Sequence, residues 1–256
     1  MILSKRIALG GIQLDQVNSA VVIRSIDPGV PKESIGAVDL MGGFGQRVTN
    51  QHWETLEVSV TYAIDIPKKQ MADRRAVFDA VNRWALAKGW LTVNWMTGKR
   101  MWVDKVVIPG SGDLWNWTDE HVITFRAYGV PFWQDDTATT NSGASITVPG
   151  MMTTVCDAEL TNDSGSTIDS LTVQIGNSSM SFGGLSLEDG HRLVIGHENN
   201  GLLYIRKYTS QDIYTSVMDK RTGGSADDLY TEPGANAITV SKNGVTASVS
   251  CFGRYV

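Results

Sequence analysis

The chain has 256 residues, of which 42% are hydrophobic and 19% are charged. This composition predicts a globular protein and excludes an intrinsically disordered one. The formal net charge of −5 disfavours a nucleic-acid partner. The sequence has no run of about 18 apolar residues, and its N-terminal stretch lacks the apolar core of a signal peptide, so neither membrane insertion nor a leader is expected.

The first 28 residues predict a small sheet. Apolar residues alternate over 7–9 and again over 12–14, and the glycine pair at 10–11 allows a tight turn between them. A β-branched strand follows over 20–26 and ends at a turn containing Pro28.

Residues 29–52 predict a long irregular loop. Loops of this length are uncommon in compact domains and are usually functional. Gly42, Gly43 and Gly45 surround Phe44 in this stretch, but their spacing differs from that of a phosphate-binding P-loop, and no helical pattern follows. Nucleotide binding is therefore not expected.

Residues 53–66 predict one long strand of alternating apolar and polar residues. Fourteen residues would span about 46 Å, well beyond an ordinary strand. Such a strand extends past its own core and offers its surplus edge to another chain. One face carries the apolar side chains Leu56, Val58, Val60, Tyr62, Ile64 and Ile66.

A helix is predicted over 71–88, because Val77, Phe78, Val81, Trp84 and Ala85 form one apolar stripe. A hairpin follows over 90–96 and 100–108, with Leu91, Val93 and Trp95 on one face. The last strand of this region lies in 118–128, where Ile123, Phe125 and Ala127 are predicted to point inward.

A domain boundary is predicted at Asp136, where a small, polar, linker-like stretch begins. All tryptophans lie before it. Residues 1–136 have balanced charges, and residues 137–256 carry the whole net charge of −5. The second region has short strands separated by Gly/Asn turns throughout, which indicates an antiparallel β-sandwich. The predicted fold is therefore mainly β with one helix, in two domains.

Residues for chemistry are scarce. The histidines His52, His121, His191 and His197 have no metal-ligand spacing, and adjacent carboxylates lie in predicted turns. We therefore expect no enzyme activity, no metal and no cofactor. The two cysteines, Cys156 and Cys251, lie near the first and last strands of the second domain. We expect buried free thiols, although a bridge is geometrically feasible.

The order of these elements resembles that of the distal tail proteins, the baseplate hub proteins of long-tailed bacteriophages. The resemblance covers nearly the whole chain, and its strength lies in the order of several weak motifs. The matching stretches are the strand 53–66, Arg75 to Trp84 in the helix, the hairpin 90–108, Phe125 to Phe132, Leu187 to Ile195, Pro233 to Ile238, and Arg254-Tyr255.

The resemblance implies a tail-tube-like ring domain over 1–136 and a galectin-like domain over 137–256. It implies a homo-hexamer at the virion tail tip, assembled in the host cytoplasm, that joins the tail tube protein to other tail-tip proteins and the host-adsorption apparatus without catalysis. The stretches surplus to a monomer fit such a ring, so the predicted interface residues are Gly42, Gly43, Phe44, Gly45, Trp53, Leu56, Val58, Val60 and Tyr62.

The alternative function is a carbohydrate-binding, receptor-recognition module. No tryptophan follows Trp133, so useful affinity for simple sugars is not expected. Tyrosines would have to stack on the sugar instead. The candidate glycan contacts are Tyr204, Tyr208, Tyr214 and Tyr230.

Overall fold

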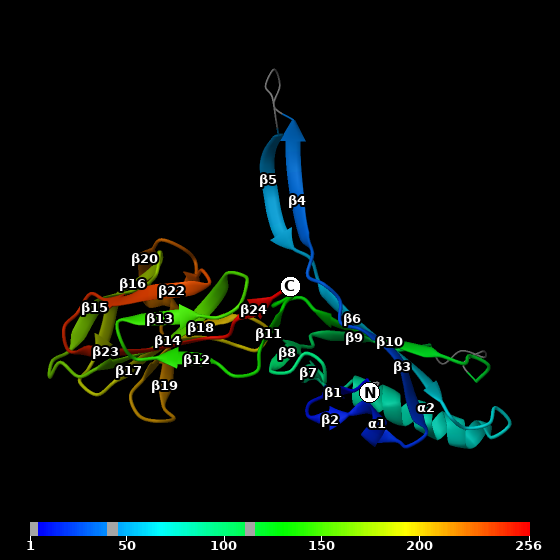
Figure 1. Ribbon diagram of the computed structural model, residues 1–256. Helices are drawn as coiled ribbons and strands as arrows, with labels where there is room; N and C mark the ends of the chain where they lie inside the picture. The colour runs from blue at the N-terminus through cyan, green and yellow to red at the C-terminus, as the bar shows by residue number, and fades with distance from the viewer. Residues whose placement is uncertain (1–4, 40–45, 111–115) are drawn as a thin grey trace. The chain divides into compact units, whose positions relative to one another are not determined.

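The computed structural model describes residues 5–39, 46–110 and 116–256. The chain divides into two compact units, unit 1 (Met1–Trp133) and unit 2 (Gln134–Val256). This division lies three residues before the predicted boundary at Asp136. Both units are built mainly from antiparallel strands, which confirms the predicted mainly β fold class (Figure 1). Among the described residues, no helix is long and apolar enough to cross a membrane.

Unit 1 contains two sheets, a separate hairpin and one long helix. Within the unit, one sheet has the strand order β2-β1-β7-β8, and the other has the order β3-β6-β10-β9. The bounds in unit 1 are β1 (Ile7–Leu9), β2 (Ile12–Gln13), α1 (Leu14–Val17), β3 (Val21–Asp27), β4 (Glu33–Asp39), β5 (Gln46–Trp53), β6 (Leu56–Ile64), α2 (Met71–Ala85), β7 (Trp90–Val93), β8 (Lys99–Trp102), β9 (Lys105–Val107) and β10 (His121–Ala127).

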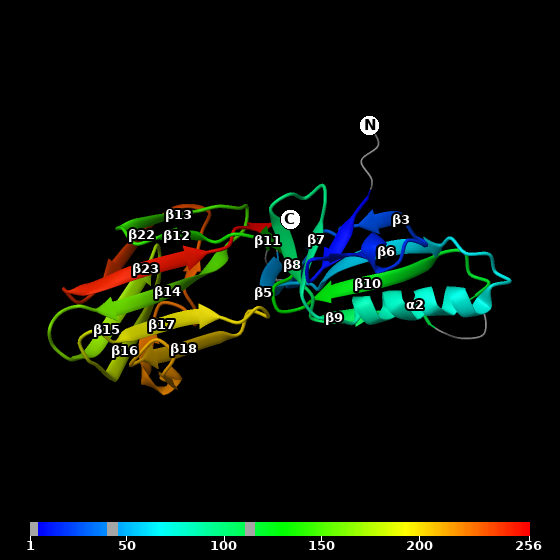
Figure 2. The ribbon, with the colours of Figure 1, turned by 90° about the horizontal axis from the view of Figure 1, so that it is seen from below.

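Helix α2 covers one face of the β3-β6-β10-β9 sheet and runs along β10 (Figure 2). Its predicted apolar stripe is buried, and the ring of Trp84 meets the ring of Phe125 edge-on at 5.9 Å. Ile123, Phe125 and Ala127 of β10 are fully buried, so the predicted faces of this strand are confirmed. The helix ends at Ala85, three residues earlier than the predicted Lys88.

The sequence pattern did not reveal a buried arginine in the first turn of this helix. Arg74 is 3% exposed. Its Nε donates to Asn116 Oδ1 at 2.8 Å, and its Nη1 donates to the carbonyl oxygens of Ile64 and Ile66 at 3.0 and 2.7 Å. Backbone and amide oxygens therefore hold the guanidinium and attach the start of α2 to the end of β6.

Two predicted strands of unit 1, over 12–14 and over 90–96, need correction at their ends. The turn at Gly10-Gly11 joins β1 and β2 as predicted, and both glycines have positive φ (59° and 84°), which glycine adopts without strain. Leu14, however, begins the short helix α1 and does not extend the strand. Trp95 is 41% exposed because β7 already ends at Val93.

The predicted irregular loop over 29–52 is wrong, because most of it forms the hairpin β4–β5. The predicted single strand over 53–66 is also wrong. β5 ends at Trp53 and the nine-residue strand β6 begins at Leu56. Between them, the N–H of Glu54 donates to the carbonyl of Lys32 at 2.8 Å, which turns the chain from the hairpin into the sheet. Of the predicted strand, only Trp53 belongs to β5, and β6 ends at Ile64, two residues before the predicted end.

Unit 2 is a sandwich of two antiparallel sheets with a shared apolar core. One sheet has the order β12-β23-β14-β17-β18-β19, with β21 also pairing with β14, and the other has the order β13-β22-β15-β16-β20. The bounds are β12 (Thr139–Asn141), β13 (Ser145–Val148), β14 (Thr154–Asn162), β15 (Ile168–Ile175), β16 (Ser178–Leu187), β17 (Arg192–His197), β18 (Leu203–Tyr208), β19 (Tyr214–Ser216), η1 (Met218–Lys220), β20 (Arg221–Gly224), β21 (Tyr230–Thr231), β22 (Gly234–Val240) and β23 (Val245–Cys251).

The ends of unit 2 lie close together. β11 (Trp133–Asp135) crosses the division between the units, and the N–H of Asp135 donates to the carbonyl of Gly253 at 3.0 Å, just before β24 (Arg254–Tyr255).

Cys156 on β14 and Cys251 on β23 are buried free thiols, as predicted.

Candidate functional site

The hairpin β4–β5 exposes apolar side chains that no core of unit 1 covers. The two strands form a sheet of their own, which extends away from the other sheets of the unit (Figure 1). Ile35, Val38 and Val48 are 56%, 58% and 55% exposed. Val48 lies opposite Ala37 in the register, so Val48 and Val38 point to opposite faces of the hairpin. Both faces therefore present apolar surface.

The predicted interface residues fall into three groups. Gly42, Gly43, Phe44 and Gly45 lie outside the described residues. Trp53 lies at the base of the hairpin, half-buried, and its ring meets the ring of Phe132 edge-on at 5.0 Å. Trp53 thereby attaches the hairpin to the body of unit 1.

The third group corrects the prediction. Leu56, Val58, Val60 and Tyr62 are each 0% exposed within the single chain, because they form the face of β6 beneath α2. These side chains are core residues of unit 1 and are not available to a neighbouring copy. The hairpin exposes apolar side chains instead, at residues predicted to form a loop.

Three of the four candidate glycan contacts gather on one face of unit 2. Tyr204, Arg206 and Tyr208 alternate on β18 and therefore share a face, and Tyr214 on β19 lies directly opposite Tyr208. With Arg192, which lies opposite Tyr208 on β17, these residues form what we call the tyrosine–arginine platform. Tyr230 is not part of it and pairs with Val155 of β14.

The platform is held together by stacking of arginines on tyrosine rings. The guanidinium carbon of Arg206 lies 4.0 Å from the ring centre of Tyr204 and 4.6 Å from that of Tyr214. Arg192 lies 5.2 Å above the ring of Tyr208. Such cation–π contacts hold both partners in place on a rigid strand. The sequence pattern revealed the tyrosines, but it did not reveal the two arginines that stack on them.

Gly196 makes room for one of these rings. It lies opposite Tyr204, and a Cβ atom at this position would come within 2.5 Å of the Tyr204 hydroxyl oxygen. The ring of Tyr204 therefore lies flat across β17, and any larger residue at this position would displace it.

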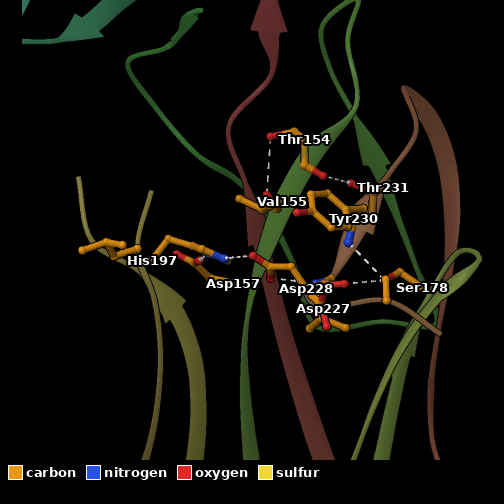
Figure 3. A network of polar contacts seen from close by, with 12 residues as sticks. Thr154, Val155, Asp157, Ser178, His197, Asp227, Asp228, Tyr230 and Thr231 are labelled. Atoms are coloured by element: carbon orange, nitrogen blue, oxygen red, sulfur yellow. Dashed lines mark hydrogen bonds and ion pairs between the residues drawn. The ribbon is translucent and has the colours of Figure 1, made fainter. Parts of the chain in front are cut away.

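A network of polar contacts lies near the platform, around His197 at the end of β17 (Figure 3). Nδ1 of His197 contacts Asp157 Oδ1 at 2.6 Å, and Nε2 contacts Asp228 Oδ2 at 2.8 Å. Asp228 continues the network, because its backbone carbonyl accepts a hydrogen bond from Ser178 Oγ. Ser178 Oγ in turn accepts a hydrogen bond from the N–H of Tyr230. The network therefore attaches the segment before β21 to both sheets.

The imidazole of His197 is charged at neutral pH. Burial opposes the charge, but the hydrogen bonds to Asp157 and Asp228 and the charges of these two carboxylates outweigh it and raise the pKa of His197 to about 9. With both ring nitrogens held by carboxylates, His197 is not placed to act as a general base. The geometry indicates a structural ion network, and no cluster of metal-ligating side chains is found in the described parts of the chain.

The network predicts a pH-dependent stability of unit 2. The pKa of His197 is about 9 in the folded protein and 6.5 in an ordinary histidine. The charged imidazole therefore makes its full contribution to the free energy of unfolding below pH 6.5, and this contribution is lost as the pH rises through 9. We expect the wild-type melting temperature to fall in this window, with a loss of roughly 3 kcal/mol. Thermal melts of wild type and His197→Gln across the same pH range check this, and an equal slope in the variant would contradict it.

The comparisons with known proteins concern the fold of the whole chain. No protein-family model matches the chain, and no curated protein matches it. The structure is similar to the Dit protein (gp 19.1) of SPP1, described as a paradigm of hub adsorption apparatus in Gram-positive infecting phages. That likeness has a TM-score of 0.65 at 10% sequence identity and covers 98% of this chain and 99% of that chain. The chain has the fold of this phage hub protein.

Two further solved structures are chains of the phage P2 baseplate in its activated conformation. The structure with Ca has a TM-score of 0.45 at 9% identity and covers 99% of this chain and 98% of that chain. The structure with Sr has a TM-score of 0.44 at 8% identity and covers 96% and 97%.

Proposed function

We propose that the protein is a structural component of a phage tail tip, a hexameric hub that joins the tail tube to the host-adsorption apparatus. The observation that carries this proposal is the fold shared with the SPP1 hub protein, because the likeness covers both units and nearly the full length of both chains. In this role unit 1 is the tail-tube-like ring domain and unit 2 is a galectin-like domain outside the ring. The role needs no catalysis and no cofactor.

The hairpin β4–β5 supports a ring of identical copies. Its apolar residues Ile35, Val38 and Val48 are more than half exposed in the single chain, and an isolated two-stranded hairpin is at best marginally stable in water. Contact with a neighbouring copy would cover this surface, and a closed ring would cover it on every copy. The charges support the same division of roles, because residues 1–136 are neutral and residues 137–256 carry the net charge of −5.

The native mass of the purified full-length protein tests the hexamer. We expect six copies by light scattering and a ring in electron micrographs. The tube and tip partners then join the two faces of the ring, and the protein is found at the tail tip of the virion after assembly in the host cytoplasm. A monomer at every concentration measured would contradict the hexameric hub.

A second candidate function, carbohydrate recognition by unit 2, is favoured by the tyrosine–arginine platform. Its rings are held by Arg192 and Arg206 on strands, so little side-chain freedom would be lost on binding. The salt bridge between Arg192 and Glu159, at 2.9 Å, adds polar groups beside the rings that could bind sugar hydroxyls. A face extending across β17, β18 and β19 suits a polymeric glycan better than a single sugar.

This candidate predicts binding on an array of polymeric glycans and none to monosaccharides. Tyr214 is the half-exposed ring of the platform, at 49%, so Tyr214→Ala is expected to reduce binding at least about tenfold, the effect of losing one stacked ring. Tyr230→Ala is the matched control, because Tyr230 is 45% exposed but lies off the platform. An array without signal, or equal loss in both variants, would remove this candidate and leave the hub.

A further inference from the structure

The two cysteines of unit 2 lie directly opposite each other on neighbouring strands. In the antiparallel register of β14 and β23, Cys156 pairs with Cys251. The N–H of Cys156 donates to the carbonyl of Leu229 at 2.9 Å, on the side of β14 away from β23. The pair therefore occupies a non-hydrogen-bonded position, where Cα atoms are about 4.5 Å apart. That separation lies within the range of disulfides, which begins near about 4.4 Å.

Both side chains point into the core of the sandwich and contact each other. Cys156 is 0% exposed and Cys251 is 2% exposed. The hydrogen bond between the two thiols is the main cause that lowers the pKa of Cys156 and raises the pKa of Cys251. The hydroxyl of Thr231 also contacts the sulfur of Cys156, at 3.3 Å. Because the Thr231 hydroxyl lies beside its sulfur, Cys156 is taken as the attacking thiol of the pair.

We propose that Cys156 and Cys251 form an oxidation site, at which a peroxide converts the two free thiols into a disulfide joining β14 to β23. The Cys156 thiolate attacks one peroxide oxygen, the O–O bond breaks, and the departing hydroxide takes a proton to become water. The sulfur of Cys251 then displaces hydroxide from the resulting sulfenic acid. The S–S bond forms, the S–O bond breaks, and the Cys251 proton leaves in a second water molecule.

The disulfide would constrain most of unit 2. The two residues enclose β15 to β22 and belong to the first and last long strands of the sandwich. A cross-link that closes a long loop restricts the unfolded chain strongly, whereas the folded strands already hold the two sulfurs together. The proposal depends on the register of β14 and β23 and not on a role in a phage tail, so its failure would leave the proposed function untouched.

The test treats the full-length protein with hydrogen peroxide under native conditions and then counts thiols after unfolding. The chain has two cysteines, so we expect both thiols to be lost and one cross-linked peptide to contain Cys156 and Cys251. The protein should remain a single chain on a non-reducing denaturing gel. We expect the melting temperature of unit 2 to rise by roughly 10 °C or more, and a dithiol reductant should reverse the shift.

The control variants are Cys156→Ala and Cys251→Ala, in which peroxide should produce no rise in melting temperature. Two thiols that remain open to alkylation after peroxide treatment would overturn the proposal. Oxidation of Cys156 to a sulfinic acid without a cross-linked peptide would overturn it as well, and so would a disulfide between two chains.

Discussion

Replacing Phe125 by aspartate is expected to abolish the folding of unit 1. Phe125 lies in the middle of β10, between Val58 of β6 and Val106 of β9, and its side chain is 0% exposed. Its ring also contacts Trp84 of α2. An unpaired carboxylate at this position costs several kcal/mol, against a total stability of roughly 5–15 kcal/mol. The soluble yield and the thermal melt of the variant measure the loss.

Val122→Asp is the matched control for this prediction. Val122 lies on the same strand but on the opposite face, and it is 48% exposed. The same substitution there places the carboxylate in water and should change stability by no more than about 0.5 kcal/mol. If Phe125→Asp melted like the wild type, the assignment of the β10 faces would be reversed.

Strands with one buried face and one exposed face could be predicted from the sequence. β10 and β14 alternate strictly between buried and less buried positions, and apolar residues dominate the buried ones. The amphipathic stripe of α2 was predicted for the same reason. The alternation exists because each element packs on a core from one side only. The buried side then requires apolar residues at the regular spacing of the strand or helix.

The hairpin β4–β5 could not be predicted in this way. Its described apolar side chains Ile35, Val38 and Val48 are more than half exposed in the single chain, so burial imposes no alternation on them. The register shift between Gly36 and Ala37 also interrupts the regular pairing of β4 with β5. No glycine or proline marks the break between β5 and β6, because the two residues that separate the strands are Glu54 and Thr55.

Residues of the candidate sites could be predicted to lie together only where they belong to the same strand. Tyr204 and Tyr208 share a face because they are four residues apart on one strand. The position of Tyr214 beside them depends on the pairing of β18 with β19. The contacts of His197 with Asp157 and Asp228 join residues 40 and 31 positions away in the chain, and only the fold brings such residues together.

Charging the hairpin is expected to convert the proposed hexamer into monomers. Ile35 and Val48 lie on β4 and β5 and are both more than half exposed. In the double variant Ile35→Glu/Val48→Glu, two charges would be desolvated at every contact between copies, at a cost of several kcal/mol per contact. Because both side chains are exposed in the single chain, the substitutions should leave the fold of each copy intact. Native mass and thermal melting of the full-length variant check both expectations.

The matched control for the hairpin is Leu202→Glu. Leu202 is 65% exposed and lies in unit 2, just before β18, so the same apolar-to-charged change there should leave six copies together. A six-copy mass in the hairpin variant would show that the copies meet through a surface other than the hairpin. Loss of the hexamer in Leu202→Glu alone would instead assign the contact between copies to unit 2. The pair of variants thus tests whether the exposed apolar side chains of β4 and β5 hold the copies together.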